Sequence, residues 1–570
     1  MINNIKQAVP VEDRIIAKNI LLILNIGGEY IANLEGNLRI RNDKRIVWII
    51  GISVFLLECM AGYYYNVYVG YYHSDGISRV ANAFYVLYSR NPHLGAIGFV
   101  WTPLPSMIDL GFLLLYPWIP AMATKGIAGL LMSAIFASLT AGILVRAFIE
   151  RGISRLYAVI FTLLYSLNPM VFIFGFNGLS DAPFIFFVIL SIIHFLNWVD
   201  KHKLGDLVVV SFALALAFWC RYEAVPFAFS MAIGCVIIAM LVSKNAAPPS
   251  EGDTRYKWSW AEGILTIIVT PLCYSIILWV LFNMIIMHNP LYFLNGDYSN
   301  TSQIQGHLSS AIYVAMVSAP VKACIFALKK ILVFSAPLIA ILIIKLFNHR
   351  LWRWDTLILL GMFISIPMLQ VIMLVKGTTL GWLRYFMYVL PVSFAWLPYE
   401  LSKVKRKWLF IIPITGMILN FIILSYAITQ PTIAPDENTF LKNTFKQHNQ
   451  TYYDEKQFSD IAGYLDENYP NSNILVDSFS AYLIILKTQF PKRLYISSDY
   501  YFNEAISDPQ KYGVSYILIP KPGSSSVISV INNAYPNLFE HGAEWAELVR
   551  DFGSKWRLYK VIRKTGGNIQ

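Results

Sequence analysis

Repeated apolar runs, each long enough to cross a lipid bilayer, are the feature that most constrains how this chain can fold. A membrane-spanning helix needs about 20 mainly apolar residues, and such runs recur up to residue 428. Because lipid offers the backbone no hydrogen-bond partners, runs of this kind fold as helices. The sequence predicts about eleven spans, near 47–66, 126–147, 156–176, 182–199, 206–222, 224–243, 261–286, 331–347, 356–375, 386–400 and 408–428.

The amino-acid composition agrees with a protein that crosses the membrane many times. Hydrophobic residues make up 56% of the chain and charged residues only 14%, about half the charged share of a soluble domain. The formal net charge is +11, but surplus lysine and arginine in a membrane protein usually mark cytoplasmic loops. We therefore expect no nucleic-acid partner. All five cysteines lie in apolar stretches, which is typical of buried, unreactive positions.

Basic residues between the apolar runs orient the chain in the membrane. If the apolar stretch 103–120 is a helix along the outer interface and does not cross, all the main basic clusters fall on one side, which the positive-inside rule makes cytoplasmic. The stretch 308–328 is interpreted in the same way. The basic segment 1–46 is then cytoplasmic as well. The clusters are Arg146/Arg151/Arg155, Lys201/Lys203, Lys244/Arg255/Lys257, His349/Arg350/Arg353 and Lys403/Lys405/Arg406/Lys407.

The composition changes to ordinary mixed polarity after the last span. Strand-like and helical stretches alternate there, which predicts a small α/β domain over 429–570, and an odd number of spans puts it outside the cytoplasm. The expected fold is an all-α polytopic membrane protein of about eleven helices over 47–428, followed by this soluble α/β domain. The expected strands are 473–479, 493–497, 516–520 and 556–562, and the helices include 454–467 and 524–534.

Polar side chains gather at the start of the long first outer loop, 67–125. His73, Asp75 and Arg79 come directly after the outer end of the first span. A carboxylate there lies at the boundary of water and lipid, where a substrate with a lipid tail and a polar head would meet it. Alternatively, Asp75 caps a helix that starts near Gly76. Arg79 could pair with Asp75 or bind phosphate.

Two further groups of charged residues lie where adjacent spans meet. Asp181 ends a short turn between two spans, and Arg221 and Glu223 stand where two spans join almost without a loop. Ionisable groups at such depth are costly unless they are paired or face a polar cavity, so they are candidates for a functional site. The alternatives are that Asp181 caps the following helix and that Arg221 and Glu223 pair with other groups to lock the bundle.

Two cations stand on the outer side, against the general charge trend. Lys376 and Arg384 both fall there, and cations in that place indicate an anion, for which phosphate is the usual choice at a bilayer surface. A lysine could equally extend its amine to lipid head groups. For Arg384, set in Trp-Leu-Arg-Tyr, specific binding is the favoured interpretation.

Together these features resemble the C-type (GT-C) integral-membrane glycosyltransferases, which include the protein O-mannosyltransferases of glycosyltransferase family 39 and the lipid A aminoarabinose transferase. The resemblance lies in Asp75, Pro-Leu-Pro at 103–105, the Asn-Pro to Asp-Ala-Pro turn at 168–183 and Arg-Tyr before a proline-containing span at 384–391. The closing Trp-Arg-Leu-Tyr, 556–559, also looks like the tails of bacterial members. The loop carries one acid where several relatives carry two, and the WWDYG-like motif of oligosaccharyltransferases is lacking.

The resemblance implies a hexosyl- or pentosyltransferase that uses a polyprenyl-phosphate-linked sugar at the outer face of the cytoplasmic membrane. Its acceptor would be a glycan, lipid or protein of the envelope. Phosphate leaves readily, so one general base suffices, and such a base is worth about 10²–10⁴ in rate. Asp75 fits the base, while Arg384 with Arg79 or Lys376 fits a clamp on the donor phosphate. Direct displacement by the acceptor would invert the anomeric centre.

Two other classes of protein also place charges at membrane depth. A transporter or flippase for a lipid-linked sugar or another polar lipid is the main alternative, although such proteins commonly have internal repeats and midplane acids. A non-catalytic protein that displays the outer domain is the third. His73, Asp75, Asp181 and Glu223 could ligate a divalent ion, but their spacing is not diagnostic, so the metal is left open and no other cofactor is expected.

Overall fold

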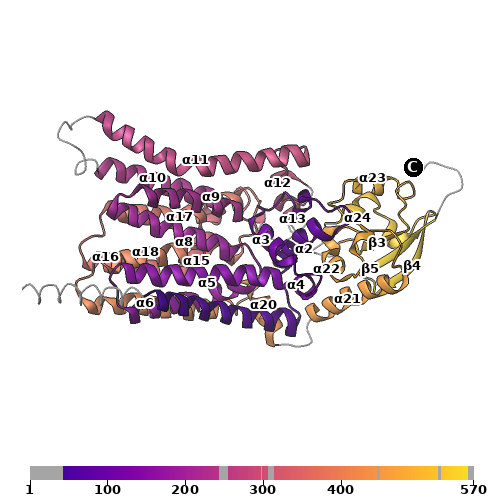
Figure 1. Cartoon of the computed structure of the whole chain (residues 1–570), viewed down its shortest axis with the longest axis horizontal. Coiled ribbons are helices and arrows are strands. Elements are labelled where there is room, and N and C mark those ends of the chain that lie inside the picture. The colour runs from indigo at the N-terminus through magenta and orange to yellow at the C-terminus, as the bar shows by residue number, and fades with distance from the viewer. Residues whose placement is uncertain are drawn as a thin grey trace, which may run out of the picture.

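The computed structural model describes residues 43–242, 254–296, 298–305, 314–445, 450–523 and 528–562. Long helices form a bundle at one end of the molecule, and a small domain with a β-sheet lies at the other (Figure 1). Within the described ranges, seven helices are long and apolar enough to cross a membrane. They are Asp43–Val69, α5 (Ile127–Glu150), α8 (Asp181–Lys201), α10 (Ala224–Val242), α11 (Thr254–Met287), α17 (Trp354–Val375) and α19 (Ile411–Ala427).

Two more predicted spans are bent helix pairs. They are α6 (Arg155–Ser166) with α7 (Pro169–Phe176), at 69°, and α15 (Pro320–Phe334) with α16 (Ala336–Phe347), at 74°. A proline stands in the first turn of each second helix, where its ring cannot donate a backbone hydrogen bond. The part of 308–328 described from Pro320 onward lies in α15, which continues to Phe334. Its interpretation as a helix along the interface stays a prediction.

The remaining two predicted spans coincide with shorter helices, α9 (Leu204–Cys220) and α18 (Val389–Leu401). At 1.5 Å per residue, α18 is only about 20 Å long. Every residue of α18 is buried, so its apolar character serves the centre of the bundle. Each of the eleven predicted apolar segments therefore contains a helix, and the predicted fold class is confirmed.

A cluster of four charged side chains ties α16, α17 and α18 together; we call it the buried charge cluster. Lys345 Nζ lies 3.0 Å from Asp355 and 2.9 Å from Glu400, and Arg350 contacts the same two carboxylates at 2.5 and 3.3 Å. Lys345, Asp355 and Glu400 are wholly inaccessible to solvent. Loss of one partner would leave an uncompensated charge in the interior, which is strongly destabilising.

Short helices of the first outer loop fill the junction between the bundle and the soluble domain (Figure 1). They are α2 (Ser74–Tyr88), α3 (Leu104–Leu113) and α4 (Ala121–Thr124). Helix α3 covers the first half of the helix predicted at 103–120. Asp109 in α3 is fully buried, and burial raises the pKa of its carboxyl to about 8 although Arg79 opposes the shift. Asp109 therefore stays mostly protonated at neutral pH.

The last part of the chain folds as an α/β domain around a five-stranded sheet of order β2-β1-β3-β5-β4. The first three strands pair in parallel, and β5 pairs antiparallel with β3 and β4. The strands are β1 (Ile474–Leu475), β2 (Leu494–Tyr495), β3 (Tyr516–Pro520), β4 (Ala546–Phe552) and β5 (Trp556–Val561). The helices are α21 (Gln450–Asn468), α22 (Ser478–Lys487), α23 (Phe502–Ser507), α24 (Val530–Ala534) and α25 (Leu538–His541), after α20 (Pro435–Phe445).

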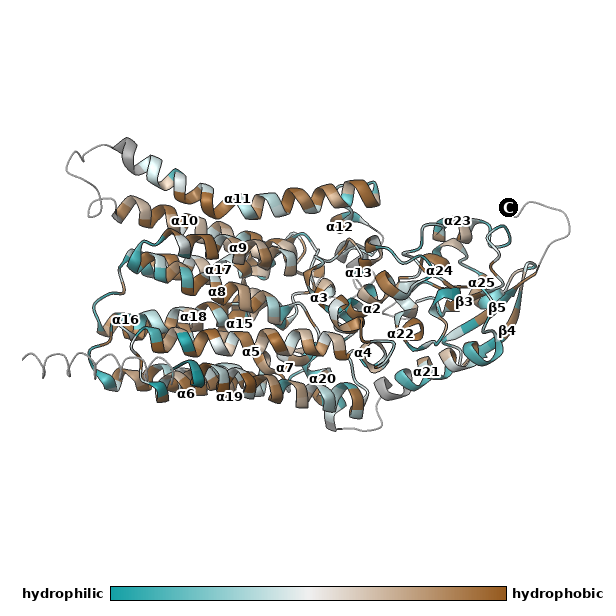
Figure 2. Ribbon diagram, in the orientation of Figure 1, coloured by the Kyte–Doolittle hydropathy of each residue, from teal (hydrophilic) through white to brown (hydrophobic). Residues whose placement is uncertain are grey.

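Polar contacts hold this soluble domain against two loops of the membrane part. Arg90 donates to Asn473 at 2.8 Å. In the loop that carries α12 (Tyr292–Asn295) and α13 (Asn300–Gln305), Tyr298 donates to Asp477 at 3.3 Å and stacks on Phe479 with ring centres 5.3 Å apart. Figure 2 shows apolar residues along the bundle and hydrophilic residues mainly in the soluble domain and at the opposite end of the bundle. The soluble domain thus covers one end of the membrane part.

Residues 1–42, most of the N-terminal segment predicted to be cytoplasmic, lie outside the described residues. So does the basic residue Lys244. The side of the membrane on which each loop lies and the domain limits at 46 and 428 stay predictions.

Candidate active site

A cavity of about 1050 Å³ lies where the helix bundle meets the soluble domain. Its volume is of the order of known small-molecule sites. The first outer loop, the segment that follows α17, the start of α20 and the soluble domain all contribute to its lining. Six predicted site residues line it, namely His73, Asp75, Arg79, Arg221, Glu223 and Arg384.

Asp75 and Arg384 form the central ion pair of this cavity. Arg384 donates to Asp75 Oδ2 at 2.7 Å. Helix α2 begins at Ser74 with His73 in the N-cap position, so the alternative that Asp75 caps a helix starting near Gly76 is wrong. Asp75 instead lies in the first turn, where the helix dipole favours an anion. At Gly76, a Cβ would lie 2.3 Å from the backbone oxygen of Asn177, so only glycine lets α2 approach that turn.

The surroundings of Asp75 set its protonation. Burial alone would raise the pKa of its carboxyl, but Arg384, His73 and Arg79 outweigh burial and lower this pKa to about 2. The His73 ring lies 3.4 Å from Arg384 through Nε2, and burial lowers the pKa of this histidine below its usual value. At neutral pH Asp75 is therefore an ionised carboxylate, and it lies beside the uncharged imidazole of His73.

Arg221 organises a second group of charges on the same wall. It donates to Glu223 at 2.8 Å, and its other amino group lies 3.5 Å from Asp181. Asp181 also accepts a hydrogen bond from Tyr388. Ser180, and not Asp181, occupies the N-cap position of α8. Asp181 does not line the cavity but holds Arg221, which does. The pairing agrees both with a lock on the bundle and with a binding role.

Arg79 lines the same cavity as Asp75. Its guanidinium donates to the carbonyl oxygen of Thr102 at 3.3 Å and lies over the Trp101 ring, 4.8 Å from its centre. Burial and the nearby Arg221 lower the pKa of Arg79 to about 10, which still leaves it charged at neutral pH. Arg79 therefore adds positive potential near Asp75.

The structure does not bring Lys376 to the cavity. Lys376 is exposed at the C-terminal end of α17 and is not among the lining residues. Only eight positions separate it from Arg384, but the chain turns between them, and Arg384 lies in the single 3₁₀ turn Leu383–Phe386. Of these two cations, Arg384 alone reaches Asp75.

An acid that sequence reasoning missed reaches the cavity from α20. Asp436 lines the cavity and lies 4.0 Å from His73 Nε2. Its neighbour Glu437 is buried, and burial together with Asp436 raises the pKa of Glu437 to about 7. Two adjacent acids directly after the last span were the sequence signal that could have found them.

The candidate metal ligands do not gather around one point. Across the described ranges, no group of three or more His, Cys, Asp or Glu residues is arranged to hold a metal ion. The Asp75, Asp181 and Glu223 carboxylates are engaged by Arg384, Tyr388 and Arg221 respectively. These residues do not fit a metal site as they stand.

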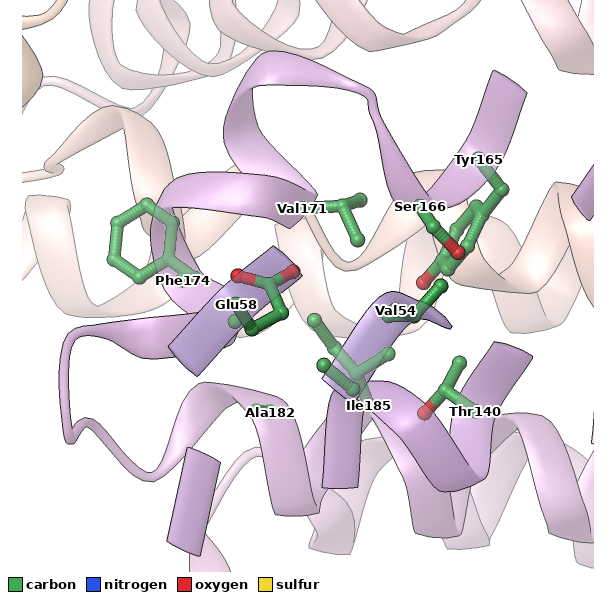
Figure 3. Close-up of a pocket in the computed structure, with 11 residues that line it drawn as sticks. Val54, Glu58, Thr140, Tyr165, Ser166, Val171, Phe174, Ala182 and Ile185 are labelled. Atoms are coloured by element: carbon green, nitrogen blue, oxygen red, sulfur yellow. The ribbon is translucent and has the colours of Figure 1, made fainter. Parts of the chain in front are cut away.

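A second, much smaller cavity of about 10 Å³ lies inside the bundle. Figure 3 shows the carboxylate of Glu58 at this cavity, with Val171 and Phe174 beside it. A space of this size is at the lower limit for one water molecule. Glu58 fits only because residue 175 is glycine, where a Cβ would lie 2.3 Å from Glu58 Oε1.

Comparison with known proteins gives a family match within the membrane part. Residues 114–274 match the family model of dolichyl-phosphate-mannose-protein mannosyltransferase. No curated protein matches the chain. ArnT from Cupriavidus metallidurans, solved in the apo state, aligns at 12% identity and a TM-score of 0.47, over 90% of this chain and 97% of that one.

The archaeal oligosaccharyltransferase AglB from Archaeoglobus fulgidus, solved with an inhibitory peptide and a dolichol-phosphate, aligns at 10% identity and a TM-score of 0.38. This alignment covers 82% of this chain and 69% of that one. The resemblance predicted from the sequence is confirmed by the family match: through residues 114–274, the chain is similar to the C-type integral-membrane glycosyltransferases.

Proposed function

We propose that this protein is an inverting membrane glycosyltransferase with Asp75 as its general base. It moves a hexose or pentose from a polyprenyl-phosphate donor to a hydroxyl of an envelope glycan, lipid or protein, at the outer face of the cytoplasmic membrane. The observation that carries the proposal is the meeting of Asp75 and Arg384 in a cavity of about 1050 Å³ between the bundle and the soluble domain. The mannosyltransferase match over residues 114–274 supports a lipid-linked donor.

The donor binds on the membrane side of the cavity. Its polyprenyl tail stays in the bilayer, and its phosphate needs cations at the boundary of lipid and water. Arg384 can grip a phosphate through two parallel N–H bonds, and Arg79 and Arg221 add positive potential on the same wall. These cations stabilise the negative charge that grows on the departing phosphate.

Asp75 takes the proton of the acceptor hydroxyl. The acceptor oxygen forms a bond to the anomeric carbon as the bond from that carbon to the phosphate oxygen breaks. Attack from the face opposite the phosphate inverts the anomeric centre. Without donor, Arg384 contributes to the low pKa of Asp75, about 2, which makes the carboxylate a weak base. When the donor phosphate draws Arg384 away, the carboxylate becomes a stronger base. The base is therefore prepared by donor binding.

The substitution Asp75→Asn tests the base. It keeps the size of the side chain and can still accept a hydrogen bond from Arg384, but it cannot take a proton. Turnover of a radiolabelled polyprenyl-phosphate sugar should fall about 100-fold or more, while donor binding persists. Near-normal turnover would refute the assignment and point to Asp436 or Glu223, the other acids among the described lining residues.

The same assay separates transfer from transport. Protein in detergent micelles has no sealed compartment and no gradient, so a transporter would bind the lipid-linked sugar without cleaving it. A transferase releases polyprenyl phosphate and passes the label to an acceptor. Binding of the donor without any release of polyprenyl phosphate, in the presence of extracts of the envelope, would contradict the proposal.

A further inference from the structure

A short turn joins the two charged groups of the cavity. It consists of residues 177–179, between α7 and α8, and we call it the 177–179 turn. On one side it touches the first turn of α2, which carries Asp75. On the other side it leads directly into Ser180 and Asp181, which lie 3.4 and 3.5 Å from Arg221. A shift of this turn would therefore move the proposed base and Arg221 relative to each other.

Three glycines let α2, α5 and the 177–179 turn approach one another closely. A Cβ at Gly76 in α2 would lie 2.3 Å from the backbone oxygen of Asn177. A Cβ at Gly129 in α5 would lie 3.2 Å from the Cα of Gly178 and 3.0 Å from Val80 Cγ2 in α2. Gly178 itself has a φ of 77°, a left-handed conformation that favours glycine. The turn is thus packed against backbone from two sides, and an added methyl group would displace it.

A hydrogen bond fixes the 177–179 turn to α5. The backbone N–H of Gly178 donates to Ser133 Oγ at 2.9 Å, and this hydroxyl donates to the carbonyl oxygen of Gly129 at 3.0 Å. Ser133 is wholly inaccessible to solvent, and a buried N–H without a partner is costly. Neither Ser133 nor Gly129 is among the described residues that line the cavity. Ser133 therefore holds the turn in place from outside the site.

Helix α5 is the element that both sides of the site share. It runs along the bundle and ends beside α2 and α4 (Figure 1). Through Gly129 it contacts both α2 and the 177–179 turn, and through Ser133 it bonds to that turn. Transfer requires the reacting atoms to be aligned and about 3–3.5 Å apart, and a misplacement of about 1 Å can cost about 100-fold in rate. The contacts with α5 therefore bear on the alignment of Asp75.

We propose that Gly129, Ser133 and Gly178 are positioning residues of the transfer reaction. They fix α2, which carries Asp75, against the turn that leads to the partners of Arg221. Their side chains and backbone touch neither substrate, so they act on the alignment of the base and not on the binding of the donor. This inference rests on the proposed glycosyl transfer and extends its machinery to residues of α5 outside the cavity.

The substitution Gly129→Ala tests the inference in the full-length protein. Single turnovers of a radiolabelled polyprenyl-phosphate sugar are followed with the enzyme in excess and an envelope extract as the source of acceptor. The rate should fall about 10- to 100-fold, while the donor Kd changes less than about threefold. Tm should stay close to that of the wild type, because alanine is the better helix former and offsets the strain. The matched control is Gly142→Ala in the same helix, where a Cβ would lie 3.7 Å from Val47 Cγ1, an ordinary contact.

The substitution Ser133→Ala loosens the turn without adding bulk. It should lower the single-turnover rate about two- to tenfold, since one hydrogen bond is lost, again with little change in donor Kd. Ser138→Ala is its control, because Ser138 lies in the same helix and donates to the carbonyl oxygen of Gly51 at 2.9 Å, away from the turn. If Ser133→Ala is as fast as Ser138→Ala, the hydrogen bond does not position the site and the inference is wrong.

A double variant shows whether the effect passes through the base. Added to Asp75→Asn, Gly129→Ala should lower the residual single-turnover rate by less than about threefold, because residues that act through one group are not additive. A merely structural defect would lower the rate by the same factor in both backgrounds. An equal factor would therefore overturn the inference.

The wild type separates failure of this inference from failure of the proposed function. If the wild type does not cleave the donor, the proposed function itself fails. If the wild type cleaves the donor and Gly129→Ala is as fast as Gly142→Ala, the positioning inference fails and the proposed function stands. If Gly129→Ala loses rate and donor affinity by the same factor, the glycine is structural and the inference is wrong.

Discussion

Replacement of Arg384 by glutamine tests how the cavity controls its base. Arg384 donates to Asp75 at 2.7 Å, and the pKa of Asp75 is about 2 against an ordinary value of 3.8. In Arg384→Gln, burial still raises this pKa, while the strongest opposing charge is gone. The pKa of Asp75 should rise by about two units or more, to about 4 or above.

The pH dependence of kcat/KM reports this change, because that parameter reflects groups of the free enzyme. Asp75 acts only when ionised, so activity is lost as pH falls through its pKa. In the wild type this acid limb lies below the range in which the protein can be assayed. In Arg384→Gln it should move to higher pH and become visible at about pH 4 to 5.

The test compares the pH at which the acid limb of kcat/KM lies, and not the level of activity. Arg384→Gln also weakens the donor clamp and so lowers activity at every pH. Lys376→Gln is the matched control, because it removes a cation that is exposed and does not line the cavity. Its profile should be that of the wild type. If Arg384→Gln shows the same acid limb as Lys376→Gln, the ion pair does not govern the base and the reasoning is refuted.

Four other predictions concern binding, stability and topology. Donor affinity should fall more in Arg384→Ala than in Arg384→Lys, because only a planar guanidinium grips phosphate through two bonds; unchanged affinity in both would make this cation structural. Lys345→Met should lower the free energy of unfolding by about 3–5 kcal/mol, seen as a lower Tm in detergent, and an unchanged Tm would contradict this. Gly175→Ala should also lower Tm, because its Cβ would meet a buried carboxylate, whereas Gly111→Ala, with open space around it, should not. A cysteine at the exposed Glu547, in a background without other cysteines, should react with an impermeant reagent in intact cells; labelling only after permeabilisation would reverse the proposed orientation.

The helices of the membrane part were predictable because lipid offers the backbone no hydrogen-bond partners, so long apolar runs fold as helices. Apolar length, with the basic clusters to set aside 103–120 and 308–328, located all eleven segments, and proline explains where two of them bend. The buried α18 shows the limit of prediction from apolar length, because a short apolar helix inside the bundle has the same composition as a membrane span. Strand β4 was missed for the opposite reason: it is an edge strand with mostly exposed or half-exposed residues, so it lacks the alternation of a half-buried strand.

The candidate site was predictable only in part. Charge rules assign a residue to one side of the membrane, and they placed both Lys376 and Arg384 on the outer side. They do not say where around the bundle a side chain lies, so they could not separate the exposed Lys376 from the buried Arg384. Lys521 and Lys555, which also line the cavity, lie in ordinary soluble sequence, where a lysine carries no signal. Their place in the cavity follows from the docking of the soluble domain.

The wide sequence separation of the residues that meet in the cavity governs when the site can exist during synthesis. Asp75 and Arg384 are 309 residues apart, and Asn91 and Asp499, which join the first outer loop to the soluble domain, are 408 residues apart. At about 5–20 residues per second, Arg384 is synthesised about 15–60 s after Asp75. The soluble domain is synthesised later still. A growing or truncated chain therefore holds the carboxylate without its partners, and the proposed transfer needs the chain from Asp75 through the soluble domain to be complete.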